Sequence, residues 1–304
     1  MKWLRDAGDP WHTRAAMGRQ DDARGSAGVP GTGLRGLFGR PFIDLGRYID
    51  LSVLPALHEE ICAGLAQMPV DYTGGSHRSM GIVPPSRAAE VEVDYGEVIR
   101  AMDEASFAVF RSLADDPAGV DPARRGAQEF GEEREVPLSR RQMLYLKYRH
   151  GVYFPWKVYV ELIPNRWWGD KADAEGKRFT RVATALFPKT IAFVRGLPFV
   201  AVGRCNIMGL EGHDHGTVHR DGDPAEQAAP DPFITVCPGP AKRLFLWDES
   251  REEATYVTGR AYWFNDHDYH GVAADPYFRY SIRVDGVFDG EFAARLVRDH
   301  GRAA

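Results

Sequence analysis

The C-terminal third of the chain alternates short apolar segments with turn residues. Val, Ile, Phe, Tyr and Trp dominate the segments, and Gly, Pro, Asp or Asn separate them. The predicted strands lie near 199–208, 214–219, 232–237, 242–247, 254–257, 260–265 and 277–285. Short strands at this spacing are typical of an all-β sandwich or barrel, so we predict a mainly β core with appended helices.

The N-terminal half has a different spacing. Apolar residues recur every three or four positions over 52–67 and 96–114, which predicts two amphipathic helices. Ser52 is the expected N-cap of the first helix. The segment 143–163 is dense in aromatic and β-branched residues and fits either a buried strand or a packed helix, whereas 180–197 favours a helix.

These patterns divide the chain into three regions. Residues 1–40 carry many Gly, Arg and Asp and little periodic apolar signal, so we expect a loosely ordered lead. Residues 41–140 are predicted to be a helical region that packs on the core, with a charged surface loop at 115–140. Residues 141–304 are predicted to form the β core itself.

Composition narrows the class of protein. The 304 residues are 44% hydrophobic and 27% charged, with a net charge of −5, which is ordinary for a globular protein and gives no support to nucleic-acid binding. Cys62, Cys205 and Cys237 are widely spaced and odd in number, so we expect buried thiols in a reducing, cytoplasmic setting. We expect neither a secretory signal in MKWLRDAGDP nor a membrane span, because both need a long apolar run.

Candidate metal ligands come from two separate segments. TVHRDGD (217–223) places His219 and Asp221 two positions apart, and residues so spaced on a strand project to the same face. FNDHDYHGV (264–272) supplies a second imidazole, His270, from a distant strand. Two histidines and one carboxylate are the ligand set of mononuclear non-haem Fe(II) oxygenases.

Other histidines near these residues are alternative ligands. His213 and His215 form a His-x-His pair in EGHDHGT, but they lack the carboxylate that would complete a triad. We interpret them as a polar entry to the strand or as substrate contacts. His267 and its neighbours Asp266 and Asp268 are interpreted as turn residues.

A second polar face follows the distal histidine. In FRYSIRVDGVF (278–288), Arg279, Ser281 and Arg283 alternate with apolar residues, so on a strand they would share one face. A guanidinium pairs a carboxylate through two parallel hydrogen bonds, which suits a dicarboxylate co-substrate. Arg279 is the preferred anchor, with Arg283 on substrate or on a second carboxylate oxygen. A structural salt bridge to Asp285 is the alternative.

These motifs resemble the 2-oxoglutarate/Fe(II)-dependent oxygenases, in particular the aspartyl/asparaginyl β-hydroxylase-like group with its bacterial amino-acid and peptide hydroxylases. The resemblance covers roughly residues 200–290 and rests on TVHRD (217–221), GRAYWFNDHDYHGV (259–272) and RYSIRVD (279–285). It implies a double-stranded β-helix core, also called a jelly roll or cupin-like fold.

The resemblance also implies a role for each motif. It makes Fe(II), 2-oxoglutarate and O₂ the cofactors, with His219, Asp221 and His270 as the iron ligands and Arg279 as the 2-oxoglutarate anchor. In the family another basic pair stands on the strand after the first histidine. Here that strand reads DPFITVCPGP, with Thr235 as the only polar side chain at its centre. We add Thr235, Ser281 and Arg283 to the predicted co-substrate site.

The predicted function is hydroxylation of an unactivated C–H bond in an amino acid or in a residue of a peptide, for bacterial natural-product tailoring. Asp221 argues against a halogenase, whose halide needs that coordination position. Two alternatives stay open: desaturation, epimerisation or cyclisation of a small metabolite at the same site, and a non-catalytic jelly-roll module that binds a metal. No nucleic acid or membrane is expected as a partner.

Overall fold

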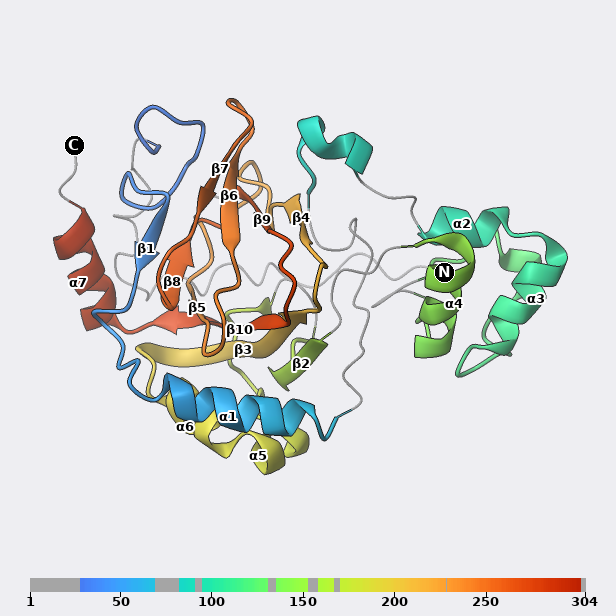
Figure 1. Cartoon of the computed structure of the whole chain (residues 1–304), viewed down its shortest axis with the longest axis horizontal. Coiled ribbons are helices and arrows are strands. Elements are labelled where there is room, and N and C mark those ends of the chain that lie inside the picture. The colour runs from blue at the N-terminus through green and yellow to red at the C-terminus, as the bar shows by residue number, and fades with distance from the viewer. Residues whose placement is uncertain are drawn as a thin grey trace, which may run out of the picture.

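The computed structural model contains two antiparallel sheets and, in the described residues, seven α-helices (Figure 1). The described residues are 28–68, 82–90, 95–130, 135–152, 158–166, 170–227 and 229–301. The strands are β1 (Phe42–Asp44), β2 (Val158–Ile163), β3 (Phe199–Leu210), β4 (Gly216–His219), β5 (Phe233–Val236), β6 (Leu244–Asp248), β7 (Glu253–Tyr256), β8 (Ala261–Phe264), β9 (Tyr269–Val272) and β10 (Arg279–Phe288). The helices are α1 (Leu54–Leu65), α2 (Tyr95–Ala101), α3 (Glu104–Ser112), α4 (Arg140–His150), α5 (Arg181–Leu186), α6 (Pro188–Arg195) and α7 (Gly290–His300). Two such sheets are compatible with the predicted jelly roll.

The larger sheet has six strands in the order β1-β8-β5-β10-β3-β2. Its central strand, β10, places Arg283 opposite Asn206 on β3 and opposite Thr235 on β5. Because directly opposite residues project to the same face, these three side chains form a polar row across the sheet. Arg283 contacts Asp221, which follows the second sheet's β4, so this row lies on the face turned toward the second sheet.

The smaller sheet has four strands in the order β4-β9-β6-β7. The short strands β4 and β9 pair antiparallel and set His219 opposite His270. This register brings together two residues that are far apart in the chain. The sheet therefore supplies both predicted histidine ligands from neighbouring strands.

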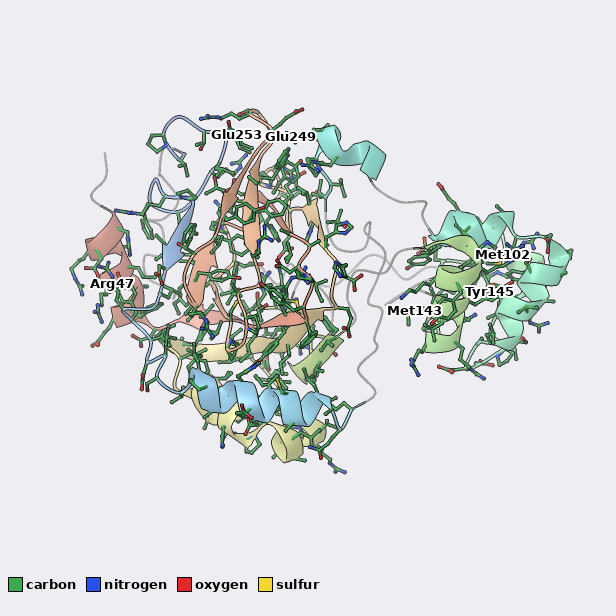
Figure 2. All side chains as sticks on the ribbon, in the orientation of Figure 1. Arg47, Met102, Met143, Tyr145, Glu249 and Glu253 are labelled. Atoms are coloured by element: carbon green, nitrogen blue, oxygen red, sulfur yellow. The ribbon has the colours of Figure 1, made fainter. Side chains whose placement is uncertain are left out.

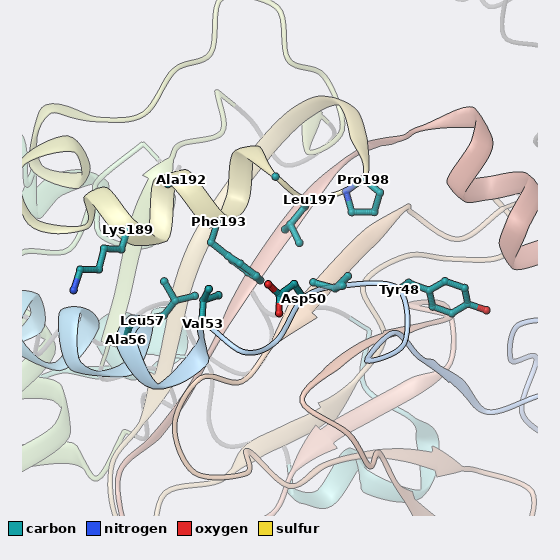
Figure 3. Close-up of a pocket in the computed structure, with 12 residues that line it drawn as sticks. Tyr48, Asp50, Val53, Ala56, Leu57, Lys189, Ala192, Phe193, Leu197 and Pro198 are labelled. Carbon is teal, nitrogen blue, oxygen red and sulfur yellow. The ribbon is translucent and has the colours of Figure 1, made fainter.

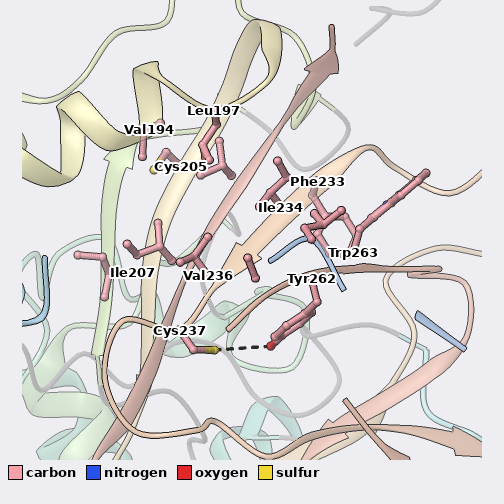
Figure 4. Packing of buried hydrophobic residues seen from close by; sticks show 14 of the residues in the cluster. Val194, Leu197, Cys205, Ile207, Phe233, Ile234, Val236, Cys237, Tyr262 and Trp263 are labelled. Carbon is pink, nitrogen blue, oxygen red and sulfur yellow. Dashed lines mark hydrogen bonds between the residues drawn. The ribbon is translucent and has the colours of Figure 1, made fainter. Parts of the chain in front are cut away.

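The other face of the larger sheet is apolar. Ile282 on β10 stands between Ile207 and Val236, and all three are fully buried. Figure 4 shows this packing, with Val194 of α6 and Leu197 against the sheet. Helices α1, α5 and α6 cover this face (Figure 1), and His58 of α1 hydrogen bonds Tyr280 of β10 at 2.9 Å. The alternation along β10 thus separates a packing face from a polar face.

Ordered structure begins nearer the N-terminus than the sequence predicted. The loosely ordered lead predicted for 1–40 is wrong for 28–40, because Leu34 and Leu37 are buried in the main core; residues 1–27 lie outside the described ones. Carboxylates hold this segment, with Asp268 accepting hydrogen bonds from the backbone N–H groups of Arg35 and Gly36 at 2.7 Å each. Strand β1 then joins the larger sheet beside β8.

The helix predicted for 52–67 is confirmed as α1, but its N-cap is not Ser52. The helix begins two residues later, with Val53 at the N-cap position and Pro55 in the first turn. Proline suits this position, because its missing N–H has no intrahelical partner there. The C-terminal helix α7 was not predicted. Asp289 caps its start by accepting hydrogen bonds from the N–H groups of Glu291 and Phe292.

Residues 95–152, here called the helical unit, have an apolar cluster of their own. Figure 1 shows α2, α3 and α4 apart from the two sheets, and Figure 2 labels Met102, Met143 and Tyr145 within them. The single helix predicted for 96–114 is divided, because Asp103 accepts a hydrogen bond from the N–H of Ser106 and starts a new helix.

The segments 143–163 and 180–197 each divide into two elements. The stretch 143–163 was predicted to be either a helix or a strand. Its first part belongs to helix α4, and its last part is strand β2. The helix predicted for 180–197 is two helices, α5 and α6, that meet at Phe187 before a proline. The domain boundary predicted at residue 141 stays a prediction, and β1 and α1 cross it by packing with the main core.

Candidate metal centre

His219, Asp221 and His270 converge at the end of the smaller sheet. One ligand atom from each lies within 4.8 Å of the others. Oδ1 of Asp221 is 3.5 Å from Nε2 of His219 and 3.7 Å from Nε2 of His270. Within the described residues this trio is the group found to place three such atoms together, and neither His213 nor His215 belongs to it.

Backbone carbonyls set the orientation of both imidazoles. Nδ1 of His219 lies 2.7 Å from the carbonyl oxygen of Thr217, and Nδ1 of His270 lies 3.0 Å from that of Asp268. A carbonyl oxygen accepts but cannot donate, so Nδ1 carries the proton in each ring. In the neutral form of each ring, Nε2 then keeps its lone pair, and it faces Asp221. This is the tautomer that a metal-binding histidine needs.

The charge states of the trio also suit a divalent cation. Burial, with the neighbouring His219, lowers the pKa of His270 to about 3, so this imidazole is neutral at pH 7. Burial acts to raise the pKa of Asp221, but the Arg283 guanidinium and the two imidazoles outweigh it and hold the pKa well below its usual range. Two imidazoles and one carboxylate, all buried or nearly so, form a donor set that fits Fe(II).

The turn that precedes His270 is fixed by its acidic residues. Asp266 accepts a hydrogen bond from the Asp221 N–H through its carbonyl and from the Asp231 N–H through its side chain. Lys171 lies 2.7 Å from Asp231 and 3.7 Å from Asp266. Burial raises the pKa of Asp266 to about 7. As predicted, Asp266, His267 and Asp268 are turn residues. Asp266 holds the loop carrying Asp221 against the turn carrying His270.

Arg279 is placed away from the trio. Its guanidinium is fully buried and donates to the carbonyl oxygens of Glu211, Asp214 and Ala273 at 3.0, 2.6 and 2.6 Å. Asp275 lies 3.4 Å from its Nε. These contacts join the loop before β4 to the loop after β9. The co-substrate role of Arg279 stays a prediction, and the contacts are those of a residue that ties two loops together.

Ser281 has a basic partner that the sequence reading missed. Nζ of Lys242 donates to Oγ of Ser281 at 2.8 Å, and the lysine is only 4% exposed. Burial, with Arg279 and Arg283 nearby, lowers the pKa of Lys242 to about 8. The lysine stands in the turn PGPAKRL before β6, where nothing in the local pattern marks it as inward-facing. Only the register of β10 brings it beside Ser281.

Arg283 and Thr235 lie nearer the trio. Arg283 donates to Oδ2 of Asp221 at 2.7 Å and also pairs with Asp285, so the structural salt bridge weighed from the sequence is present. Thr235 is buried on β5 directly opposite Arg283. The roles predicted for both in binding the co-substrate stay predictions.

A separate cavity of about 490 Å³ opens on the other side of the larger sheet. Val53, the N-cap of α1, and Leu57 of α1 lie across it from Phe193 of α6, and Asp50 and Lys189 also line it (Figure 3). None of the predicted site residues lines it. The chemistry suggested by the trio therefore belongs to the space between the sheets and not to this cavity.

Comparisons with known proteins give weak matches to solved structures alone. No protein-family profile matches the chain, and a search of curated proteins gives no match. A 2OG-Fe(II) oxygenase family oxidoreductase from Burkholderia pseudomallei is similar over 42% of this chain and 66% of its own, at 12% identity and a TM-score of 0.28. The chain thus spans just under two thirds of that protein.

Two further structures are similar at the same level. AviO1 from Streptomyces viridochromogenes Tue57 matches 47% of this chain and 79% of its own, at 14% identity and a TM-score of 0.25. A prolyl hydroxylase from Trichoplax adhaerens, solved with a hypoxia inducible factor peptide, matches 64% and 98%, at 12% identity and a TM-score of 0.24. TM-scores this low do not establish a shared fold. Among the described residues, no helix is long and apolar enough to cross a membrane.

Proposed function

We propose that this chain is an Fe(II)- and 2-oxoglutarate-dependent oxygenase that hydroxylates an unactivated C–H bond of an amino acid or of an amino-acid residue in a peptide. The observation that carries the proposal is the convergence of His219, Asp221 and His270, with both Nε2 atoms turned toward Asp221 Oδ1. This trio would hold Fe(II). With 2-oxoglutarate and O₂ the metal supplies C–H oxidation, and succinate and CO₂ are the co-products.

The chain's own residues would orient the co-substrate. Ser281 lies two positions before Arg283 on the same face of β10, about 7 Å along the strand. Arg283 contacts the carboxylate of the trio, so Ser281, with Lys242 beside it, lies on the sheet face that carries the proposed metal site. We assign the distal carboxylate of 2-oxoglutarate to Lys242 and Ser281, because a buried ammonium beside a hydroxyl is a strong carboxylate site.

This assignment changes the anchor expected from the sequence. Arg279 was the preferred anchor, but it already donates to three backbone carbonyls. Lys242 offers a cation beside the predicted Ser281, which stands two residues nearer than Arg279 to Arg283 along β10. Arg279 would act indirectly, by holding the loop before β4 to the loop after β9.

The test follows 2-oxoglutarate directly. Anaerobic addition of 2-oxoglutarate to the Fe(II)-loaded protein should give a weak visible charge-transfer band, and aerobic incubation should form succinate. A panel of amino acids and short peptides is then screened for stimulated succinate formation, with product mass reporting whether oxygen is added. A protein that binds Fe(II) without any spectral response to 2-oxoglutarate would be a metal-binding module and not an oxygenase. The cytoplasmic location and the natural-product context stay predictions.

A further inference from the structure

The two oxygens of the Asp221 carboxylate have different surroundings. Oδ1 faces both imidazoles, at 3.5 and 3.7 Å from their Nε2 atoms. Oδ2 instead accepts a hydrogen bond from Arg283 at 2.7 Å. The side chain is nearly buried, with 5% of it exposed, so water does not compete freely for either oxygen. One oxygen is thus turned to the metal position and the other to a fixed cation.

The guanidinium of Arg283 is itself held in place. Its Nε and NH2 atoms each lie 3.0 Å from Oδ1 of Asp285. Oδ2 of Asp285 in turn accepts a hydrogen bond from Nε of Arg204 at 2.9 Å and lies 2.8 Å from its NH2. The ring of Phe233 lies 4.0 Å below the guanidinium carbon. A planar group fixed on three sides cannot swing away from Asp221 without breaking buried ion pairs, which is costly.

We propose that Arg283 is a positioning residue that keeps Oδ2 of Asp221 off the metal, so that the carboxylate binds through Oδ1 alone. The inference rests on the proposed function, because it assumes a divalent cation at the trio. A free aspartate can bind a metal through both oxygens and would then take one coordination position more. A facial triad must leave three positions open for the keto acid and O₂. The clamp preserves that count.

Arg283→Gln tests the clamp, because glutamine removes the charge and the fork but keeps a polar side chain. Mn(II) binding is measured by calorimetry, and 2-oxoglutarate binding is measured on the Mn(II)-saturated protein. We expect Mn(II) affinity to fall by about 10- to 100-fold, the usual effect of losing a residue that orients a metal ligand. The visible spectrum of the Co(II)-loaded protein should also change, since a second aspartate oxygen becomes free to bind.

Arg260→Gln is the matched control. Arg260 donates to the backbone carbonyls of Cys237, Pro238 and Gly239, and none of these belongs to the trio. This control should leave Mn(II) affinity and the Co(II) spectrum unchanged. A merely structural role for Arg283 would alter the melting temperature of the R283Q protein while its Co(II) spectrum stayed that of the wild type, and that result would overturn the proposal.

Arg283→Lys keeps the test decisive if the glutamine variant does not fold. Lysine can give Asp221 one donor but cannot also fork onto Asp285, so Mn(II) affinity should fall by about 3- to 10-fold. Unchanged affinity and an unchanged Co(II) spectrum in this variant would refute the clamp. A wild-type protein that binds neither Mn(II) nor Co(II) is a different result, since it would refute the proposed metal site itself.

Discussion

The two sheets and the helical unit solve the same packing problem in different ways. The helical unit buries apolar side chains such as Ile99, Phe110 and Leu146, and its charges lie mostly outside. The sheets bury charges as well, among them Arg283 and Asp285. Burying charge is tolerated only where each group meets a partner at a fixed position, and strand register supplies such positions. The polar chemistry is therefore concentrated where long-range pairing is most regular.

Loss of a predicted metal ligand is expected to have the largest effect. It should abolish activity at the site between the sheets and leave the helical unit unchanged. His270→Ala removes one of the two imidazoles opposite each other on β4 and β9. Succinate formation should fall to the level without enzyme, and Mn(II) affinity should fall by more than about 100-fold, beyond the loss expected for a residue that only orients a ligand. The helical unit should keep its hydrogen-exchange protection. Full turnover by this variant would remove the ligand assignment.

A cavity in the other region should leave the site intact. Phe110 is fully buried between Phe107 and Phe130 in the helical unit. Phe110→Ala should destabilise the unit by about 3–5 kcal/mol, measured as faster hydrogen exchange over 95–152. Mn(II) affinity should stay that of the wild type. A parallel loss of Mn(II) binding would show that the two regions fold as one.

The buried lysine gives the next effect. Lys242→Met keeps the length of the side chain but removes the cation beside Ser281. The dissociation constant of 2-oxoglutarate should rise by about 10- to 100-fold, the loss expected for a charged hydrogen bond. Mn(II) affinity should not change, because Lys242 is not a ligand. Equal affinity for 2-oxoglutarate in both proteins would return the anchor to Arg279.

The smallest effect is a pH dependence of the same contact. Burial lowers the pKa of Lys242 to about 8, and a bound carboxylate would raise it by favouring the charged form. Affinity for 2-oxoglutarate should thus be full below pH 8 and fall by up to about tenfold per unit above it. In Lys242→Arg the affinity should stay level up to pH 10, since a guanidinium remains protonated. A fall of the same size in both proteins would place the titrating group elsewhere.

Local patterns predicted the convergence of the trio better than they predicted its surroundings. The two-residue spacing of His219 and Asp221 and the turn before His270 are short-range features, and the structure brings all three together. Lys242 could not be found in this way, because its neighbour Ser281 is set by chain pairing and not by spacing. The order of strands in each sheet is of the same kind. Pairings between distant segments depend on which arrangement buries the most apolar surface, and a single sequence does not display that choice.

The helices show where local reading reaches its limit. The amphipathic spacing of 96–114 was correct, yet one aspartate, Asp103, ends one helix and starts another. Periodicity shows which face of a helix is apolar. It does not show where an N-cap residue starts a new helix with the same apolar spacing. The early ordering of 28–40 was missed for the opposite reason, since its partners Asp268 and Asn265 lie at the other end of the chain.

The contact between Asp268 and residues 35 and 36 has a consequence for the order in which the protein folds. The side chain of Asp268 binds the backbone of residues 35 and 36, while its carbonyl aligns the ring of His270. Residues 35 and 36 are synthesised early, but they cannot make these hydrogen bonds until Asp268 has been synthesised. A chain whose C-terminal residues are still being synthesised cannot make these contacts, so the proposed iron site would be completed late in folding.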